Sequence, residues 1–159
     1  MATEYPDVLR LADIDPDQLL RLLAEYDLRL ETCVDEQPVP GSFWGEEEAG
    51  LKGNILYARK DTPLHSILHE TCHFICLDEQ QRKQLDTDAG SDDDEECAVC
   101  YLQVLLADRL DCLGRIRMFA DMDAWGYSFR LGSSQAWFEE DADDARHWLL
   151  ERGLIGAKQ

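Results

Sequence analysis

The chain has 159 residues, 45% of them hydrophobic, which is enough for one domain with its own core but too few for two. Thirty-four acidic residues against fifteen basic ones give a formal net charge of −19, which argues against nucleic-acid binding because phosphates would be repelled. No apolar run approaches the roughly 20 residues of a membrane span, and residues 1–10 carry no basic-then-apolar leader. We therefore expect one cytoplasmic domain, residues 1–159, that binds neither nucleic acid nor membrane.

The first predicted element is a helix that starts at residues 15–18, where the chain reads Asp-Pro-Asp-Gln. Its apolar face consists of Leu19, Leu20, Leu22, Leu23 and Tyr26. Residues 34–53 are rich in Pro and Gly and predict turns and short strands, with Phe43 and Trp44 as apolar anchors. Residues 54–59 (Asn-Ile-Leu-Tyr-Ala-Arg) predict a strand that ends a small antiparallel sheet and whose edge can hold an extended peptide.

A second helix should start at Thr62 and Pro63, with the Thr62 hydroxyl as N-cap and the proline in the first helical position. Residues 69–73 of this helix read His-Glu-Thr-Cys-His, the pattern His-Glu-x-x-His. Side chains four apart on a helix lie within about 40° of each other, so His69 and His73 can hold one cation. Glu70 lies beside them and can take a proton from metal-bound water. The pattern predicts a zinc hydrolase.

A catalytic zinc ion usually has three protein ligands and a water molecule, so a third ligand is expected downstream. Residues 95–113 predict a helix, and by its apolar spacing Glu95 faces the packed interior while Glu96 lies at the edge of the apolar stripe. A carboxylate facing the interior is costly unless it is paired or bound to a metal. We prefer Glu95 as third ligand, with Glu96 as the alternative. The acidic residues 86–94 before this helix predict a solvated loop.

The remainder completes a mostly helical chain. Residues 114–132 look less regular, and a final helix is predicted over residues 134–152, before Gly153. Together with the strand at residues 54–59, these elements predict an α+β fold, mostly helical, with a small β-sheet beside the helix of residues 69–73.

Residues 50–110 resemble the gluzincin metallopeptidases, and among them the small ImmA/IrrE-like or minigluzincin group. In that family a strand leads into a His-Glu-x-x-His helix, and a second helix supplies a glutamate ligand from a Glu-x-x-Ala pattern, here residues 95–98. The resemblance implies a zincin-like domain with His69, His73 and Glu95 as zinc ligands and Glu70 as general base. It also implies hydrolysis of peptide bonds in a protein or peptide substrate.

Two features of such an enzyme stay open at this point. The donor that would stabilise the oxyanion has three candidates that the sequence does not rank: Tyr127, Arg130 and His147. The negative charge has two interpretations, namely solubility alone or a preference for substrates rich in Lys or Arg. Nothing in the sequence indicates an oligomeric state.

The cysteines allow a rival interpretation of the function, a noncatalytic metal- or thiol-dependent sensor that binds a protein partner. The chain contains six of them: Cys33, Cys72, Cys76, Cys97, Cys100 and Cys112. Cys72 and Cys76 share the helix of the two histidines, whereas Cys97 and Cys100 form a Cys-x-x-Cys on the next helix. The simpler interpretation is reduced thiols that pack in the core. His65, one turn before His69, is expected to be partly exposed or to support the metal carboxylate.

Overall fold

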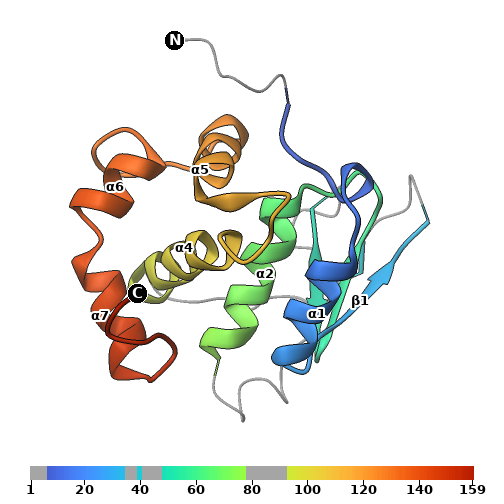
Figure 1. Cartoon of the computed structure of the whole chain (residues 1–159), viewed down its shortest axis with the longest axis horizontal. Coiled ribbons are helices and arrows are strands. Elements are labelled where there is room, and N and C mark those ends of the chain that lie inside the picture. Colours follow the sequence, from blue (N-terminus) through green and yellow to red (C-terminus); the bar gives the residue numbers. More distant parts are fainter. Residues whose placement is uncertain (1–6, 35–38, 41–47, 78–92) are drawn as a thin grey trace. The chain divides into compact units, whose positions relative to one another are not determined.

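The structure, a computed structural model, describes residues 7–34, 39–40, 48–77 and 93–159 (Figure 1). The predicted anchors Phe43 and Trp44 and most of the predicted acidic loop lie outside these residues. The chain divides into two compact units. We call Arg10–Gly90 the sheet unit, and Ser91–Gln159 with Met1–Leu9 the helical unit. The prediction of a single domain stays a prediction.

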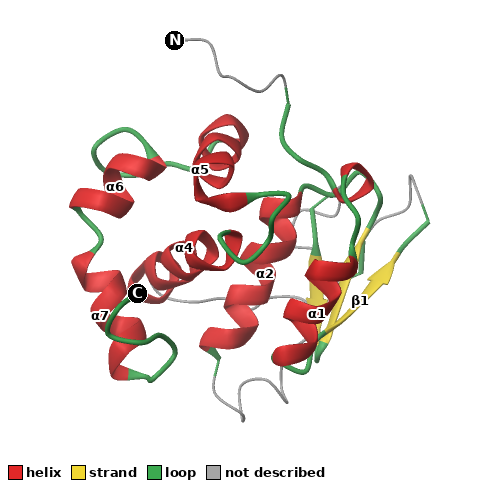
Figure 2. Cartoon of the chain, viewed as in Figure 1, coloured by secondary structure: helices red, strands yellow, loops and turns green. Residues whose placement is uncertain are grey.

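The sheet unit contains a three-stranded sheet in the order β1-β3-β2 (Figure 2). Strand β1 (Arg29–Thr32) runs parallel to β3 (Ile55–Ala58), and β2 (Gly50–Lys52) runs antiparallel to it. The strand predicted at residues 54–59 is confirmed as β3. The sheet is mixed, however, and β3 is its central strand among the described residues, so the prediction of an antiparallel sheet with an open β3 edge is wrong. Strand β1 was missed because its sequence, Arg-Leu-Glu-Thr, has a weak strand pattern.

Helix α2 (Leu64–Cys76) carries the His-Glu-x-x-His pattern and packs on β2 and β3. Pro63, not Thr62, is its N-cap, and this residue makes no side-chain capping hydrogen bond. The Thr62 hydroxyl instead accepts the backbone N–H of Arg59 at 2.8 Å, within the turn that follows β3. Helix α1 (Asp17–Glu25) starts where predicted and packs on β1, and a short 3-10 helix, η1 (Leu11–Asp13), precedes it.

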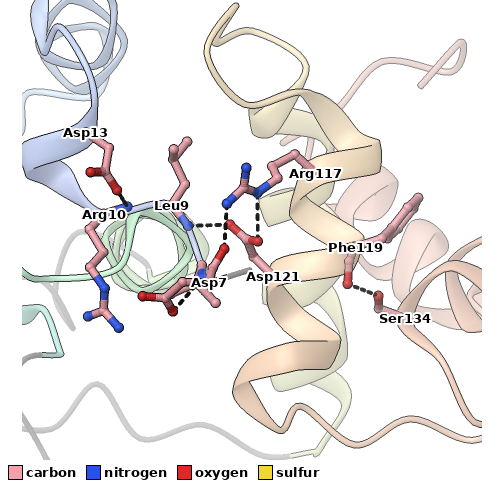
Figure 3. Close-up of polar contacts among 9 residues, drawn as sticks. Asp7, Leu9, Arg10, Asp13, Arg117, Phe119, Asp121 and Ser134 are labelled. Atoms are coloured by element: carbon pink, nitrogen blue, oxygen red, sulfur yellow. Dashed lines mark hydrogen bonds and ion pairs between the residues drawn. The ribbon is translucent and has the colours of Figure 1, made fainter. Parts of the chain in front are cut away.

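The described part of the helical unit contains four helices: α4 (Asp93–Ala107), α5 (Gly114–Trp125), α6 (Ser134–Glu140) and α7 (Asp143–Glu151). Helix α4 ends six residues earlier than predicted, and α5 occupies residues predicted to be irregular. The predicted final helix is two helices, α6 and α7, interrupted at Asp141 and Ala142. Helix α4 packs on α5 and α7, and the Ser134 hydroxyl ties α6 to α5 by donating to the Phe119 carbonyl at 3.1 Å (Figure 3).

These elements confirm the predicted fold class, an α+β fold that is mostly helical with a small sheet beside the His-Glu-x-x-His helix. None of the helices in the described ranges is both long and apolar enough to cross a membrane.

Candidate metal centre

Helix α2 brings the Nε2 atoms of His69 and His73 to 3.2 Å from each other. The ring centroids are 4.8 Å apart and the ring planes meet at 79°. A tetrahedral zinc ion with Zn–N bonds of about 2.0–2.1 Å holds two nitrogen ligands roughly 3.3 Å apart. The pair therefore fits two coordination positions of one zinc ion. A hydrogen bond between two neutral imidazoles would give a similar distance, and metal binding distinguishes the two interpretations.

The start of α2 is fixed by the turn that joins it to β3. Arg59 donates from Nε to the Asp61 carboxylate at 2.8 Å, and this hydrogen bond is the main reason that the pKa of Asp61 is lowered. Arg10 donates to the Asp61 carbonyl at 2.7 Å, and the backbone N–H of Leu11 donates to the Thr62 carbonyl at 2.9 Å. The segment of Arg10 and η1 thus holds the residues immediately before the helix of the histidines.

Burial along α2 changes at the motif. Leu64, Ile67 and Leu68 are completely buried, whereas His69 and Glu70 are partly exposed. His73 is buried again, with 7% of its surface exposed. One residue along a helix is a rotation of about 100°, so Glu70 projects away from the line of the two imidazoles. This arrangement leaves the Glu70 carboxylate beside the two imidazoles but not in line with them, which is the position a general base would need if the imidazoles held a metal.

His65 differs from the sequence expectation. Only 1% of its surface is exposed, so the expectation of a partly exposed side chain is wrong. Burial, together with the charges of His69 and Arg10, lowers the pKa of His65 to about 3. His65 is therefore a neutral imidazole near pH 7 and a core residue of α2.

The acidic residues at the start of α4 suit that position even without a metal, because carboxylates near a helix N-terminus are stabilised by the helix dipole. Glu95 and Glu96 are both partly buried, so the predicted difference in burial between them is not observed. His69, Glu70 and His73 belong to the sheet unit and Glu95 to the helical unit. The choice of Glu95 as third ligand stays a prediction.

One further donor pair on α4 was not singled out from the sequence. The Glu96 carboxylate and the Cys100 thiol lie one turn apart, with their ligand atoms within 4.8 Å of each other. Cys100 is buried, with 7% of its surface exposed. The signal in the sequence is the same four-residue spacing that relates His69 and His73.

The remaining cysteines support the interpretation of thiols packed in the core only in part, because Cys97 and Cys112 are exposed and Cys33 is partly exposed. Cys72 and Cys76 are buried in α2, and neither belongs to a group of three possible metal ligands within the part of the chain that the structure describes. Burial raises the pKa of Cys97, and the nearby Cys100 and acidic side chains raise it further. A raised pKa leaves less Cys97 thiolate at neutral pH, which lowers the reactivity of this thiol.

The three candidates for the oxyanion donor all lie in the helical unit. Arg130 forms a bidentate ion pair with Asp141, and His147 lies 2.9 Å from Glu151 on the exposed side of α7. Tyr127 is partly buried, and its hydroxyl lies 3.4 Å from the side-chain nitrogen of Gln103, which is fully buried. Tyr127 is thus the candidate whose contact is with a buried polar group.

Comparison with known proteins gives no match, whether with models of protein families, with curated proteins or with solved structures. The resemblance to the gluzincins therefore rests on the two short patterns at residues 69–73 and 95–98.

Proposed function

We propose that this chain is a zinc-dependent metallopeptidase that hydrolyses peptide bonds in a protein or peptide substrate. The observation that supports this most is the 3.2 Å separation of the His69 and His73 Nε2 atoms, on a helix that also carries Glu70 between them. Two histidine nitrogens and one carboxylate form a common ligand set of catalytic zinc. In this proposal Glu95 is the third ligand.

A bound zinc ion would polarise the scissile carbonyl and lower the pKa of a water molecule in the open coordination position. Glu70 would act as general base, accepting a proton from this water and later delivering it to the leaving amine. Its partial exposure keeps the carboxylate accessible to water and substrate. Because His73 is buried, the residues packed around it would restrict the orientation of its imidazole towards the metal.

The experiment that tests the metal centre is elemental mass spectrometry of the purified chain after reconstitution with zinc. We expect about one zinc ion per chain, lost in His69→Ala and His73→Ala and reduced in Glu95→Gln. If Glu95→Gln retains zinc while Glu96→Gln and Cys100→Ser lose it, the ligands on helix α4 are Glu96 and Cys100 and not Glu95. A chain that binds no zinc even after reconstitution would refute the proposal.

His147→Ala is the matched control, because His147 is an exposed histidine of the helical unit, paired with Glu151. It should retain all of its zinc. Circular dichroism of each metal-free variant identifies changes that act by unfolding, which matters most for the buried His73.

The alternative is a noncatalytic sensor on the same fold, and the Glu96–Cys100 pair is the observation that favours it. A thiolate ligand is oxidised more readily than a carboxylate, so a zinc ion held by Cys100 would be released by mild oxidants. Zinc that stays bound through oxidation, in a chain that also hydrolyses peptides, would exclude the sensor.

A further inference from the structure

Strand β1 has one backbone edge that pairs with β3 and one that faces away from it. The N–H of Arg29 donates to the Asn54 carbonyl at 3.0 Å, and the N–H of Cys33 donates to the Ala58 carbonyl at 2.7 Å. Because backbone groups alternate along a strand, the N–H and C=O groups of Leu30 and Thr32 point to the opposite side. No other strand in the described ranges lies on that side, since β1 is the end of the sheet order (Figure 1).

The side chains of β1 carry opposite charges two residues apart. Arg29 and Glu31 are both exposed, and they lie on the same face of the sheet because residues two apart in a strand do so. Neither forms an ion pair among the residues that the structure describes. Just beyond the strand, Val34 has 75% of its surface exposed, one of four large apolar side chains that are exposed in the described chain. Among the described residues this edge is unpaired, and an edge with these features is open to pairing with another strand.

We propose that the outer edge of β1 pairs, antiparallel, with β1 of a second copy of this chain, with Leu30 opposite Leu30. The two Leu30 residues would then exchange N–H to C=O hydrogen bonds across a two-fold axis. Arg29 of each copy would lie opposite Glu31 of the other, in the pairing position where side chains are closest. The result is one continuous six-strand sheet with two ion pairs on one face.

The charges also select this register over its neighbours. Sliding one strand by two residues in one direction places Glu31 opposite Glu31, and sliding it in the other direction places Arg29 opposite Arg29. Like charges directly opposite each other destabilise a strand pair. Because each copy has a formal net charge of −19, the copies repel each other at low ionic strength. At physiological salt the screening length is about 8 Å, which reduces this repulsion more than it weakens ion pairs in contact.

The test is sedimentation equilibrium of the full-length chain over a range of concentrations, with charge reversals on β1. The unchanged chain should dimerise, and Arg29→Glu and Glu31→Arg should each raise the dissociation constant about tenfold or more, because each places like charges opposite each other twice. A mixture of the two single variants should form heterodimers, and the double variant should dimerise again. Lys52→Glu on β2, which changes the net charge by the same amount as Arg29→Glu, should leave the dimer intact.

Three results would overturn the proposal. The first is an unchanged chain that is monomeric at every concentration. The second is a dimer whose dissociation constant is the same in all of the β1 variants, which would place its interface elsewhere. A monomeric chain whose β1 amides become protected from hydrogen exchange on adding an unrelated extended peptide would show that the edge takes a peptide. Circular dichroism of each variant checks that it is folded, and because Arg29 and Glu31 are exposed we expect no loss of structure.

Discussion

The carboxylate of Asp121 on α5 accepts the backbone N–H of Leu9 at 2.8 Å, although the two residues are 112 positions apart (Figure 3). Asp121 is 1% exposed and forms an ion pair with Arg117, one turn earlier on the same helix, at 2.8 Å. Arg117 in turn donates to the Asp7 carbonyl at 2.7 Å. Residues 7–9 are thus bound to the helical unit by a buried carboxylate and its guanidinium partner.

Replacing Asp121 by Ala should destabilise the protein by about 2–4 kcal/mol, because the change leaves Arg117 and the Leu9 N–H without their buried acceptor. Urea unfolding measures the loss in the free energy of unfolding, and the backbone amide of Leu9 should exchange its hydrogen faster in the variant. Glu151→Ala is the control, because its pair with His147 is exposed and worth less than about 1 kcal/mol. Equal losses in the two variants would mean that the Asp121 contacts contribute little.

A second prediction concerns Ser66, which connects α2 to the residue before β2. Its buried hydroxyl accepts the N–H of Ala49 at 3.0 Å. Ser66→Ala leaves this buried N–H without an acceptor and should cost about 1–3 kcal/mol. Hydrogen exchange should be accelerated at Ala49 more than at amides inside α2. Unchanged exchange at Ala49 would show that another group replaces the hydroxyl. Ser128→Ala, at an exposed position, is the control.

His65 should make the metal-free protein sensitive to acid. Its pKa in the folded state, about 3, lies below the ordinary value of 6.5, so the unfolded chain binds a proton between these values and the folded chain does not. Stability is therefore full above about pH 6.5 and falls as the pH drops towards 3, by up to about 1.4 kcal/mol per pH unit from this residue.

The measurement is the free energy of unfolding against pH, with zinc removed by a chelator, for the unchanged chain and for His65→Gln. The variant is expected to be less stable overall, so the comparison is between slopes. Between about pH 6 and pH 4 the slope should be shallower in His65→Gln, and above about pH 7.5 the two slopes should coincide. Parallel curves throughout would mean that His65 is protonated in the folded state.

The sequence predicted correctly those elements whose signals lie within a few neighbouring residues, such as a helix start or an apolar repeat. Residues 15–18 start α1 as expected, and the apolar residues around His69 predicted a buried helix, which is α2. The predictions that failed depend on contacts distant in sequence. The Thr62 hydroxyl accepts a hydrogen bond from the backbone N–H of Arg59 in the preceding turn and therefore does not cap the helix N-terminus. The central position of β3 depends on β1, whose four residues have little apolar pattern.

The candidate site divides in the same way. The spacing of His69 and His73 within one helix was enough to predict that their nitrogens meet, and they do so at 3.2 Å. The contrast between Glu95 and Glu96 was argued from one helix face, but near a helix end both side chains are partly exposed. The proximity of Glu96 and Cys100 follows from the same four-residue spacing, whereas the Cys-x-x-Cys pattern relates Cys100 to Cys97 instead. Periodicity within a helix is reliable, whereas burial depends on what packs against it.

The last prediction separates hydrolysis from metal binding. Glu70→Gln keeps the size of the side chain and removes the base, so the variant should retain zinc and lose about 10²- to 10⁴-fold in the rate of peptide hydrolysis. The assay uses a fluorogenic peptide mixture that includes Lys- and Arg-rich members, which tests whether the net charge of −19 leads to a preference for basic substrates. Glu25→Gln, an exposed position on α1, is the control and should keep full activity. If Glu70→Gln hydrolyses peptides as fast as the unchanged chain, Glu70 is not the base. A chain that binds zinc but shows no hydrolysis that depends on Glu70 would instead fit the sensor.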